Sequence, residues 1–158
     1  MIQQQQQQPF TQQYIQPQTT PLHRDINPST AVGTLIFRPL EARFNQDNNW
    51  IIKMNPYCKF KVGWHTAKSS VDKHGGKFPK WTDSVALARK HGEEFAKLKL
   101  KDKDRITRDD NLGESKIMLR EVIENGRVNK WFNLYKGNKI TGEILLDIEF
   151  NTSSIMDT

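Results

Sequence analysis

Apolar and polar residues alternate in short runs along most of the chain from Gly33 onward, and Gly, Pro, Asn and Asp separate the runs. Alternation at every second residue is typical of a strand that buries one face, because successive side chains of a strand point to opposite sides. The runs that we expect to form strands are Thr34–Phe44, Tyr57–Gly63, Thr66–Asp72, Trp81–Ala88, Phe95–Leu100, Lys116–Leu119, Trp131–Leu134 and Gly142–Phe150. They predict an all-β fold in which two antiparallel sheets pack together, closed by a long C-terminal strand.

The segment from Asp83 to Lys101 is the main competitor for a helix. Ala, Leu, Arg, Lys and Glu dominate it, and its apolar positions also suit a short amphipathic helix. His91 and Gly92 interrupt the segment, and glycine is a poor helix former. We therefore predict two strands joined at His91–Gly92 and little helix in the chain as a whole.

The first residues of the chain have a different texture. Gln3 to Gln8 form an unbroken run, further glutamines follow, and four prolines occur before Gly33. Such a segment buries too little apolar surface to offset the entropy of ordering it. We predict a Gln/Pro-rich tail over residues 1–32, disordered or extended along a partner, a folded domain over 33–150 and a short C-terminal tail over 151–158.

Length and composition fit one soluble domain, with 158 residues of which 35% are hydrophobic and 27% charged. The sequence shows no apolar run long enough to span a bilayer and no pattern of a signal peptide, so we expect a cytoplasmic location. The single cysteine, Cys58, falls in a strand pattern and is expected to be a small buried side chain.

Positive charge is concentrated in the middle of the chain. The net charge is +6, and the segment from Lys53 to Lys103 holds 13 basic and 5 acidic residues. Such a segment suits phosphate in nucleic acid, anionic lipid or a phosphoinositide head group, and it also suits an acidic protein surface. Charge alone does not choose among these partners.

A short acidic stretch from Asp102 to Glu114 connects two of the predicted strands. Asp102, Asp104 and Asp110 could converge on one hard cation there, since calcium takes about six to eight oxygen ligands at about 2.3–2.6 Å. The alternative is a solvated acidic turn. No helix–loop–helix arrangement of an EF-hand is implied.

Several motifs occur in the order found in one known family. They are Gly33-x-Leu35-x-Phe37 with Ala42, Asn55-Pro56-Tyr57-Cys58-Lys59-Phe60-Lys61, Phe78-Pro79-Lys80-Trp81, the Asp102 loop and Gly142-Glu-Ile-Leu-Leu. In these motifs the chain from Gly33 to Phe150 resembles a C2 domain. The resemblance implies an eight-stranded antiparallel Greek-key β-sandwich whose last strand pairs near the first.

The same resemblance implies a calcium site at one end of the sandwich, through which C2 domains bridge to anionic phospholipid. Asp102, Asp104 and Asp110 fall on the ligand positions of the third loop. In the first loop, Asn49 and Asn55 replace two aspartates, and each replacement removes a charge on which affinity depends.

Asp47 lies in the same first loop, and a small shift in register would aim it at the ion. We therefore expect weak calcium binding or none, and no other cofactor.

The resemblance also implies a lipid-binding face. Lys59 and Lys61 alternate on one strand and Lys68 lies on the strand beside it, at the positions of a lysine-rich cluster that binds phosphoinositides without calcium. Tyr57 stands where an aromatic residue packs near the ligand, and Trp50 in the first loop is a candidate for membrane insertion. The alternative is a basic sheet face that contributes only solubility.

Motifs of catalysis are missing from the sequence, which has no Gly-rich phosphate loop, no metal-type histidine or cysteine spacing and no nucleophile turn. We predict that the chain is not an enzyme, and we expect no nucleic-acid partner because no recognition helix or aromatic RNA-binding strand occurs.

Two functions remain open. One is a module that associates peripherally with anionic phospholipid or phosphoinositide membranes, with weak or no calcium dependence. The other is a scaffolding subunit of a cytoskeletal or structural assembly, which contacts protein subunits through the sandwich and residues 1–32.

Overall fold

The computed structural model describes residues 26–45 and 53–153, and these residues form eight strands and one short helix. The elements are β1 (Gly33–Phe44), β2 (Pro56–Val62), β3 (His65–Lys68), β4 (Val85–Arg89), β5 (Phe95–Asp102), β6 (Asp110–Met118), α1 (Leu119–Asn125), β7 (Arg127–Lys136) and β8 (Lys139–Thr152). The predictions for Asp47, Asn49 and Trp50, and for residues 1–25 of the tail, lie outside the described residues.

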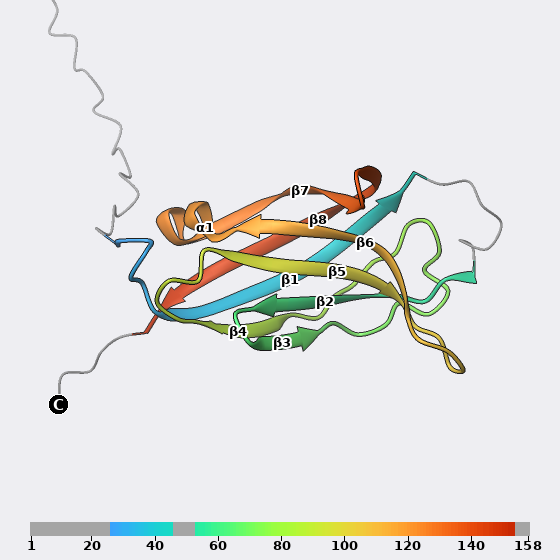
Figure 1. The fold of residues 1–158 in the computed structure, drawn as a ribbon, viewed down its shortest axis with the longest axis horizontal. Helices are drawn as coiled ribbons and strands as arrows, with labels where there is room; N and C mark the ends of the chain where they lie inside the picture. Colours follow the sequence, from blue (N-terminus) through green and yellow to red (C-terminus); the bar gives the residue numbers. More distant parts are fainter. Residues whose placement is uncertain (1–25, 46–52, 154–158) are drawn as a thin grey trace, which may run out of the picture.

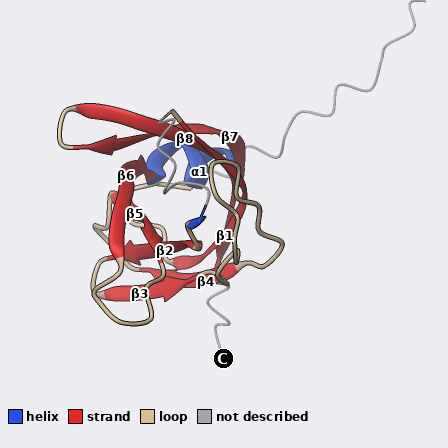
Figure 2. Cartoon of the chain, turned by 90° about the vertical axis from the view of Figure 1, so that its right-hand side faces the viewer, coloured by secondary structure: helices blue, strands red, loops and turns tan. Residues whose placement is uncertain are grey.

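The strands form one antiparallel sheet in the order β3-β2-β5-β6-β7-β8-β1-β4. The sheet folds over between β6 and β7, where a single residue pair, Glu114 and Tyr135, joins its two halves. Figure 2 shows the strands enclosing a common interior. The predicted all-β, eight-stranded fold with β8 beside β1 is therefore confirmed.

The core lies between the two four-stranded layers. Phe37 of β1 stacks on Phe60 of β2 with ring centroids 4.6 Å apart, although these strands are not neighbours in the sheet. Alternate residues are buried in several strands, as Leu35 and Phe37 are in β1 and Leu98 and Leu100 in β5, with no exposed surface, whereas the short edge strand β3 buries none. Period-two burial is what the alternation in the sequence predicted.

Several predicted boundaries were wrong, and local hydrogen bonds explain two of them. The strand expected over Thr66–Asp72 ends at Lys68, because the Ser70 N–H and hydroxyl donate to the Asp83 carboxylate instead of a neighbouring strand. The strand expected from Trp81 begins at Val85, and the Trp81 ring is buried with its Nε1–H donating to the Pro56 carbonyl at 3.2 Å.

The strand expected over Lys116–Leu119 begins earlier, at Asp110, so the connection before it is shorter than the sequence indicated. A register shift between Leu100 and Lys101 keeps β5 and β6 paired as far as Asp102 and Asp110. The prediction was wrong because the exposed Asp110 and Glu114 belong to the solvent side of a strand rather than to a loop.

Helix α1 was not predicted, and Leu119 begins it rather than ending a strand. Leu119, Val122 and Ile123 are buried at helical spacing, and Gly126 ends the helix in a left-handed conformation with φ +78°. The two strands predicted on either side of His91–Gly92 are confirmed as β4 and β5.

The connections group at two ends of the molecule (Figure 1). Residues 69–84 and 103–109 lie at one end with the β7–β8 turn, and α1 and both described chain ends lie at the other. Residues 26–32, which the sequence assigned to the tail, contact this second end: the Ser153 N–H donates to the Val32 carbonyl, and Ile26 packs against the core.

Candidate functional site

The connection from β5 to β6 is an acidic loop held by its own hydrogen bonds. The Asp104 carboxylate accepts bonds from the Ile106 N–H at 2.9 Å and from the Thr107 hydroxyl at 2.7 Å. These donors, the Ile106 N–H first, lower the pKa of Asp104. The Asp104 oxygens therefore serve the turn in which they lie.

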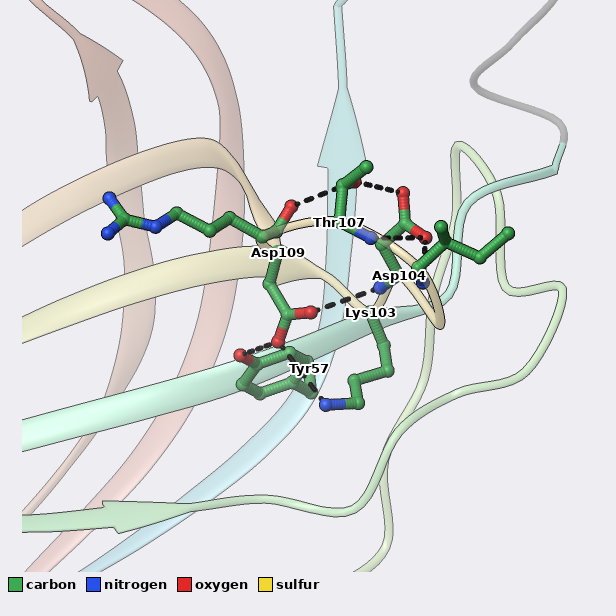
Figure 3. A network of polar contacts seen from close by, with 7 residues as sticks. Tyr57, Lys103, Asp104, Thr107 and Asp109 are labelled. Carbon is green, nitrogen blue, oxygen red and sulfur yellow. Dashed lines mark hydrogen bonds and ion pairs between the residues drawn. The ribbon is translucent and has the colours of Figure 1, made fainter.

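Asp109 is the centre of a polar network at the base of this loop (Figure 3). Its carboxylate accepts the Tyr57 hydroxyl at 2.5 Å and the Asp104 N–H at 3.1 Å. The Lys103 ammonium lies 3.6 Å from the same carboxylate. The Tyr57 bond and these neighbours lower the pKa of Asp109. Sequence reasoning did not select Asp109 as a site residue.

Asp102 and Asn55 join the first and third loops. The Asn55 N–H donates to the Asp102 carboxylate at 2.8 Å, and the Lys103 N–H donates to the Asn55 carbonyl at 3.0 Å. Burial raises the pKa of Asp102, the Asn55 bond opposes this rise, and the negative charges of Asp110, Asp104 and Asp109 add to it.

The Asn55 side chain reaches a third connection. Its Oδ1 accepts the His74 N–H at 3.0 Å, and His74 has a left-handed backbone with φ +59°. The uncharged side-chain amide of Asn55 is enough to accept this hydrogen bond. Asn55 therefore fastens the 69–84 connection to the first loop in the position where the resemblance places a metal ligand.

The described residues do not fit the calcium site implied by the resemblance. Asp102 and Asp110 are paired across β5 and β6, but Asp104 turns to its own loop and Asn55 to His74. Within residues 26–45 and 53–153, no group of three or more His, Cys, Asp or Glu side chains is placed to hold an ion. The expected contributions of Asp47 and Asn49 lie outside these ranges.

A second candidate site covers the solvent side of the layer β3-β2-β5-β6. Lys59 lies opposite Lys68 on β3 and opposite Lys99 on β5. Lys61 lies opposite Lys97, which lies opposite Lys116 on β6. The lysine face is the set Lys59, Lys61, Lys68, Lys97, Lys99, Lys101 and Lys116.

The structure thus brings together the three lysines that the sequence selected and adds four that it did not. Glu114, opposite Lys99, is the acidic residue paired into these rows. A hollow of about 280 Å³ between β5 and β6 is lined by Lys97, Lys99, Glu114, Lys116 and Tyr135, among others. A signal for the added lysines was present, because Lys97, Lys99 and Lys101 alternate with buried residues in β5.

Charges on the two layers are arranged differently. On β1, β7 and β8, arginines form ion pairs, as Arg127 does with Asp147 at 2.5 Å and Arg38 with Glu149 at 3.0 Å. Among the residues that the structure describes, no member of the lysine face lies within ion-pair distance of a carboxylate. The lysine face therefore carries an excess of positive charge, with seven lysines and one acidic residue, Glu114, in its rows.

Tyr57 connects the lysine face to the acidic loop. It lies on the same side of β2 as Lys59, the Lys68 ammonium lies 5.8 Å from its ring centre, and its side chain is buried. Burial, and then the bond to Asp109, raises the pKa of Tyr57 to about 12. Tyr57 therefore lies beneath the lysine face. The resemblance implies that an aromatic residue at this position packs near the ligand.

Comparison with known proteins shows the family to which the chain is similar. A family model for the C2 domain matches residues 33–134. The 16 kDa phloem protein 2 of Arabidopsis thaliana is 30% identical over 122 residues, which are 77% of this chain and 83% of that protein. Elicitor-responsive protein 3 of Oryza sativa subsp. japonica is 28% identical over 126 residues, 79% of this chain and 88% of that protein.

Solved structures show the same likeness. A C2 domain-containing protein attributed to an elicitor-responsive gene superposes with a TM-score of 0.73 at 27% identity, covering 85% of this chain and 100% of that one. The calcium-bound pair of C2 domains from Extended-Synaptotagmin 2 gives a TM-score of 0.64 at 26% identity, covering 78% of this chain and 47% of that one.

Within the described residues, no helix has the length and apolar content to cross a bilayer.

Proposed function

The chain belongs to the C2 domain family, and from this premise we propose that it is a non-enzymatic module that associates peripherally with anionic phospholipid or phosphoinositide membranes. The lysine face makes the contact, and calcium contributes little or nothing. Lys59, Lys61 and Lys68 are the core of the contact surface, and the lysines of β5 and β6 extend it.

The observation that carries this proposal is the placement of lysine directly opposite lysine in four strand pairings. They are Lys59 with Lys68, Lys59 with Lys99, Lys61 with Lys97, and Lys97 with Lys116. Like charges directly opposite in a sheet destabilise it, by a few tenths of a kcal/mol to about 1 kcal/mol per pair. A negatively charged surface relieves this repulsion, so the arrangement suits an anionic partner.

Membrane binding of such a face is strong enough to function without a metal. Each lysine near an anionic bilayer contributes about 1 kcal/mol. Four or five engaged lysines would therefore supply about 4–5 kcal/mol before any other contact is made.

Weak calcium dependence follows from the state of the acidic loop. Asp104 and Asp109 accept bonds from the protein, and the Lys103 ammonium near Asp109 supplies positive charge there. A calcium ion would have to displace these donors and lie close to the Lys103 ammonium. Without an ion, the loop keeps these hydrogen bonds and stays folded.

Sedimentation with lipid vesicles tests the proposal. The full chain is mixed with vesicles of phosphatidylcholine alone, with added phosphatidylserine, and with added phosphoinositide, each with calcium and with chelator. We expect binding to both anionic vesicles regardless of calcium. The charge reversal Lys59→Glu/Lys61→Glu should weaken it by at least about tenfold.

A matched control is available on the β7–β8 hairpin, where Lys136 also lies opposite a lysine, Lys139. Lys136→Glu/Lys139→Glu changes the charge by the same amount away from the lysine face. We expect it to keep most of the vesicle binding. Equal losses in the two double variants, or no binding of the unaltered chain to anionic vesicles, would overturn the proposal.

The scaffolding function stays a prediction, since residues 1–25 lie outside the described residues. The part of residues 1–32 that is described contacts the domain itself, through the Ala31 carbonyl and Arg89 and through Val32 and Ser153.

A further inference from the structure

The turn between β2 and β3 presents a tryptophan to solvent. Trp64 is 93% exposed, although folded proteins bury most of the surface of their tryptophans. Gly63 makes the tight turn with φ +56°, and the Lys61 ammonium lies 6.0 Å from the centre of the Trp64 ring. The ring therefore projects from the tip of a short hairpin at one edge of the lysine face.

Two further apolar side chains lie at the same end of this layer. Phe95 begins β5 and pairs with Met118 at the end of β6, and these side chains are 37% and 54% exposed. The Lys116 ammonium lies 4.3 Å from the centre of the Phe95 ring. The lysine face thus ends in an apolar margin formed by Trp64, Phe95 and Met118.

The space between the turn and β5 is hollowed. A depression of about 350 Å³ is lined by residues that include Lys61, Gly63, Glu93, Phe95 and Lys97. One oxygen of the Glu93 carboxylate accepts the Lys90 N–H at 2.8 Å, and the other lies against Gly63 of the turn that carries Trp64. The exposed rings therefore lie next to ammonium groups of the lysine face.

Such a combination matches the boundary between lipid head groups and acyl chains. Tryptophan concentrates at that boundary because its ring is apolar and its N–H is polar, and lysines beside it reach the phosphates. We propose that Trp64, supported by Phe95 and Met118, is an interfacial anchor that enters an anionic bilayer, so that the domain lies on the membrane along its lysine face. This inference rests on the proposed function and adds the orientation of docking.

The opposite end of the domain offers a competing anchor, Ile106, which is 92% exposed in the 103–109 loop. Between Lys103 and Asp110 three basic residues face three acidic ones, so the charge around Ile106 sums to zero. The row nearest Trp64 instead contains Lys61, Lys97 and Lys116, against Glu93 and Glu94 in the depression beside it, which leaves one positive charge in excess. Phe78, 61% exposed in the 69–84 connection, is a further apolar side chain at the Ile106 end. Trp64 differs from both in that it borders the lysine face.

The test measures partition of the full chain onto phosphatidylcholine vesicles containing phosphatidylserine. Trp64→Ala should weaken partition about tenfold, since burial of a large apolar side chain is lost, and Trp64→Phe should lose less. Ile106→Ala, which removes an equally exposed apolar side chain at the other end, should stay within about twofold. The thermal unfolding midpoints of the three variants should match that of the unaltered chain, because the changed side chains are exposed.

Fluorescence locates the ring directly. Bromine atoms on the upper part of the acyl chains should quench part of the tryptophan emission, and Trp64→Ala should remove the quenched part. If the unaltered chain binds these vesicles and Trp64→Ala has the same affinity and the same quenching, the anchor is overturned and the proposed function stays intact. A larger loss in Ile106→Ala would overturn it as well, whereas no vesicle binding by the unaltered chain would reject the proposed function itself.

Discussion

At the scale of single residues, Asp109 and Lys103 organise the third loop. Asp109 accepts the Tyr57 hydroxyl and the Asp104 N–H, and the Lys103 ammonium lies 3.6 Å from it. These contacts hold the loop closed with protein donors where a calcium ion would need free carboxylate oxygens. Asp104 and Asp109 thus accept hydrogen bonds that hold the loop in its fold.

Removal of the loop cation should make calcium binding easier. We expect Lys103→Ala to raise calcium affinity by up to about tenfold, a value kept modest because the Lys103 side chain is half exposed and its charge is screened by solvent. Isothermal titration calorimetry measures the change. Arg105→Ala removes one charge from the same exposed loop and is the control, and an equal gain in both variants would show that net charge rather than Lys103 is responsible.

Tyr57 and Asp109 should make stability depend on pH at both extremes. The pKa of Tyr57 is raised to about 12 in the folded state, so the stability that its neutral form contributes is complete below its ordinary pKa near 10 and is lost as pH rises through about 12. The pKa of Asp109 is lowered, so its contribution is present above about pH 4 and is lost as pH falls further.

Tyrosinate absorbance checks the alkaline half of this prediction. A component titrating near pH 12 should vanish in Tyr57→Phe, persist in Tyr135→Phe, and move to lower pH in Asp109→Asn because the bonded negative charge is gone. A Tyr57 component that titrates near pH 10 in the unaltered protein would contradict the bond to Asp109.

At the scale of elements, the register of β3-β2-β5-β6 converts separate lysines into one face. A shift of one residue between β2 and β5 would place Lys59 against Leu98 or Leu100 instead of Lys99. The buried residues of β2 and β5 fix this register from the core side. The lysines therefore stay opposite one another on the solvent side despite their repulsion.

Relief of that repulsion should stabilise the free protein. We expect Lys97→Thr to raise the free energy of unfolding by about 0.5 kcal/mol, because it removes like charges opposite Lys61 and Lys116 and threonine suits a strand. The same variant should bind anionic vesicles more weakly. Urea unfolding and vesicle sedimentation measure the two effects.

A control for Lys97→Thr is Lys130→Thr on β7, since Lys130 pairs with Glu121 at 2.5 Å. Its replacement should leave stability unchanged or lower it slightly. If Lys97→Thr destabilised the protein as well, lysine repulsion would not be the dominant interaction on this face.

At the scale of the whole molecule, charge is divided between the two layers. The layer of β1, β7 and β8 pairs its arginines with carboxylates, whereas among the described residues no lysine of the lysine face forms an ion pair. The protein therefore has a positively charged side, which is the side that would face an anionic surface under the proposed function.

Vesicle binding should consequently depend strongly on salt. Between about 0.1 and 1 M salt the Debye length falls from about 10 to about 3 Å, and we expect affinity for anionic vesicles to fall by at least about a hundredfold. Trp64→Ala should bind more weakly than the unaltered chain at low salt, and its affinity should fall by the same factor at high salt. Salt does not screen the apolar contribution of the ring, so that contribution does not change the salt dependence. Binding that persists at high salt would point to an apolar or protein-like contact instead.

Local patterns in the sequence were enough to establish the fold class and the core of the basic site. Alternation with buried residues is a local property of a strand, so the eight strands, the β4–β5 division at His91–Gly92 and the pairing of Lys59 with Lys68 across a short hairpin could be predicted. The helical spacing of Leu119, Val122 and Ile123 was also present in the sequence, but four alternating residues before it favoured a strand.

Which distant side chains meet depends instead on the folded arrangement of the chain. The β5 lysines join those of β2 through a register about forty residues apart in the chain, and the Tyr57 bond to Asp109 crosses 52 positions. Whether Asp104, Asp109 and Asn55 direct their oxygens toward an ion or toward backbone N–H groups depends on loop conformation. Residue spacing places such carboxylates near one another, whereas hydrogen bonding in the folded loops sets their direction.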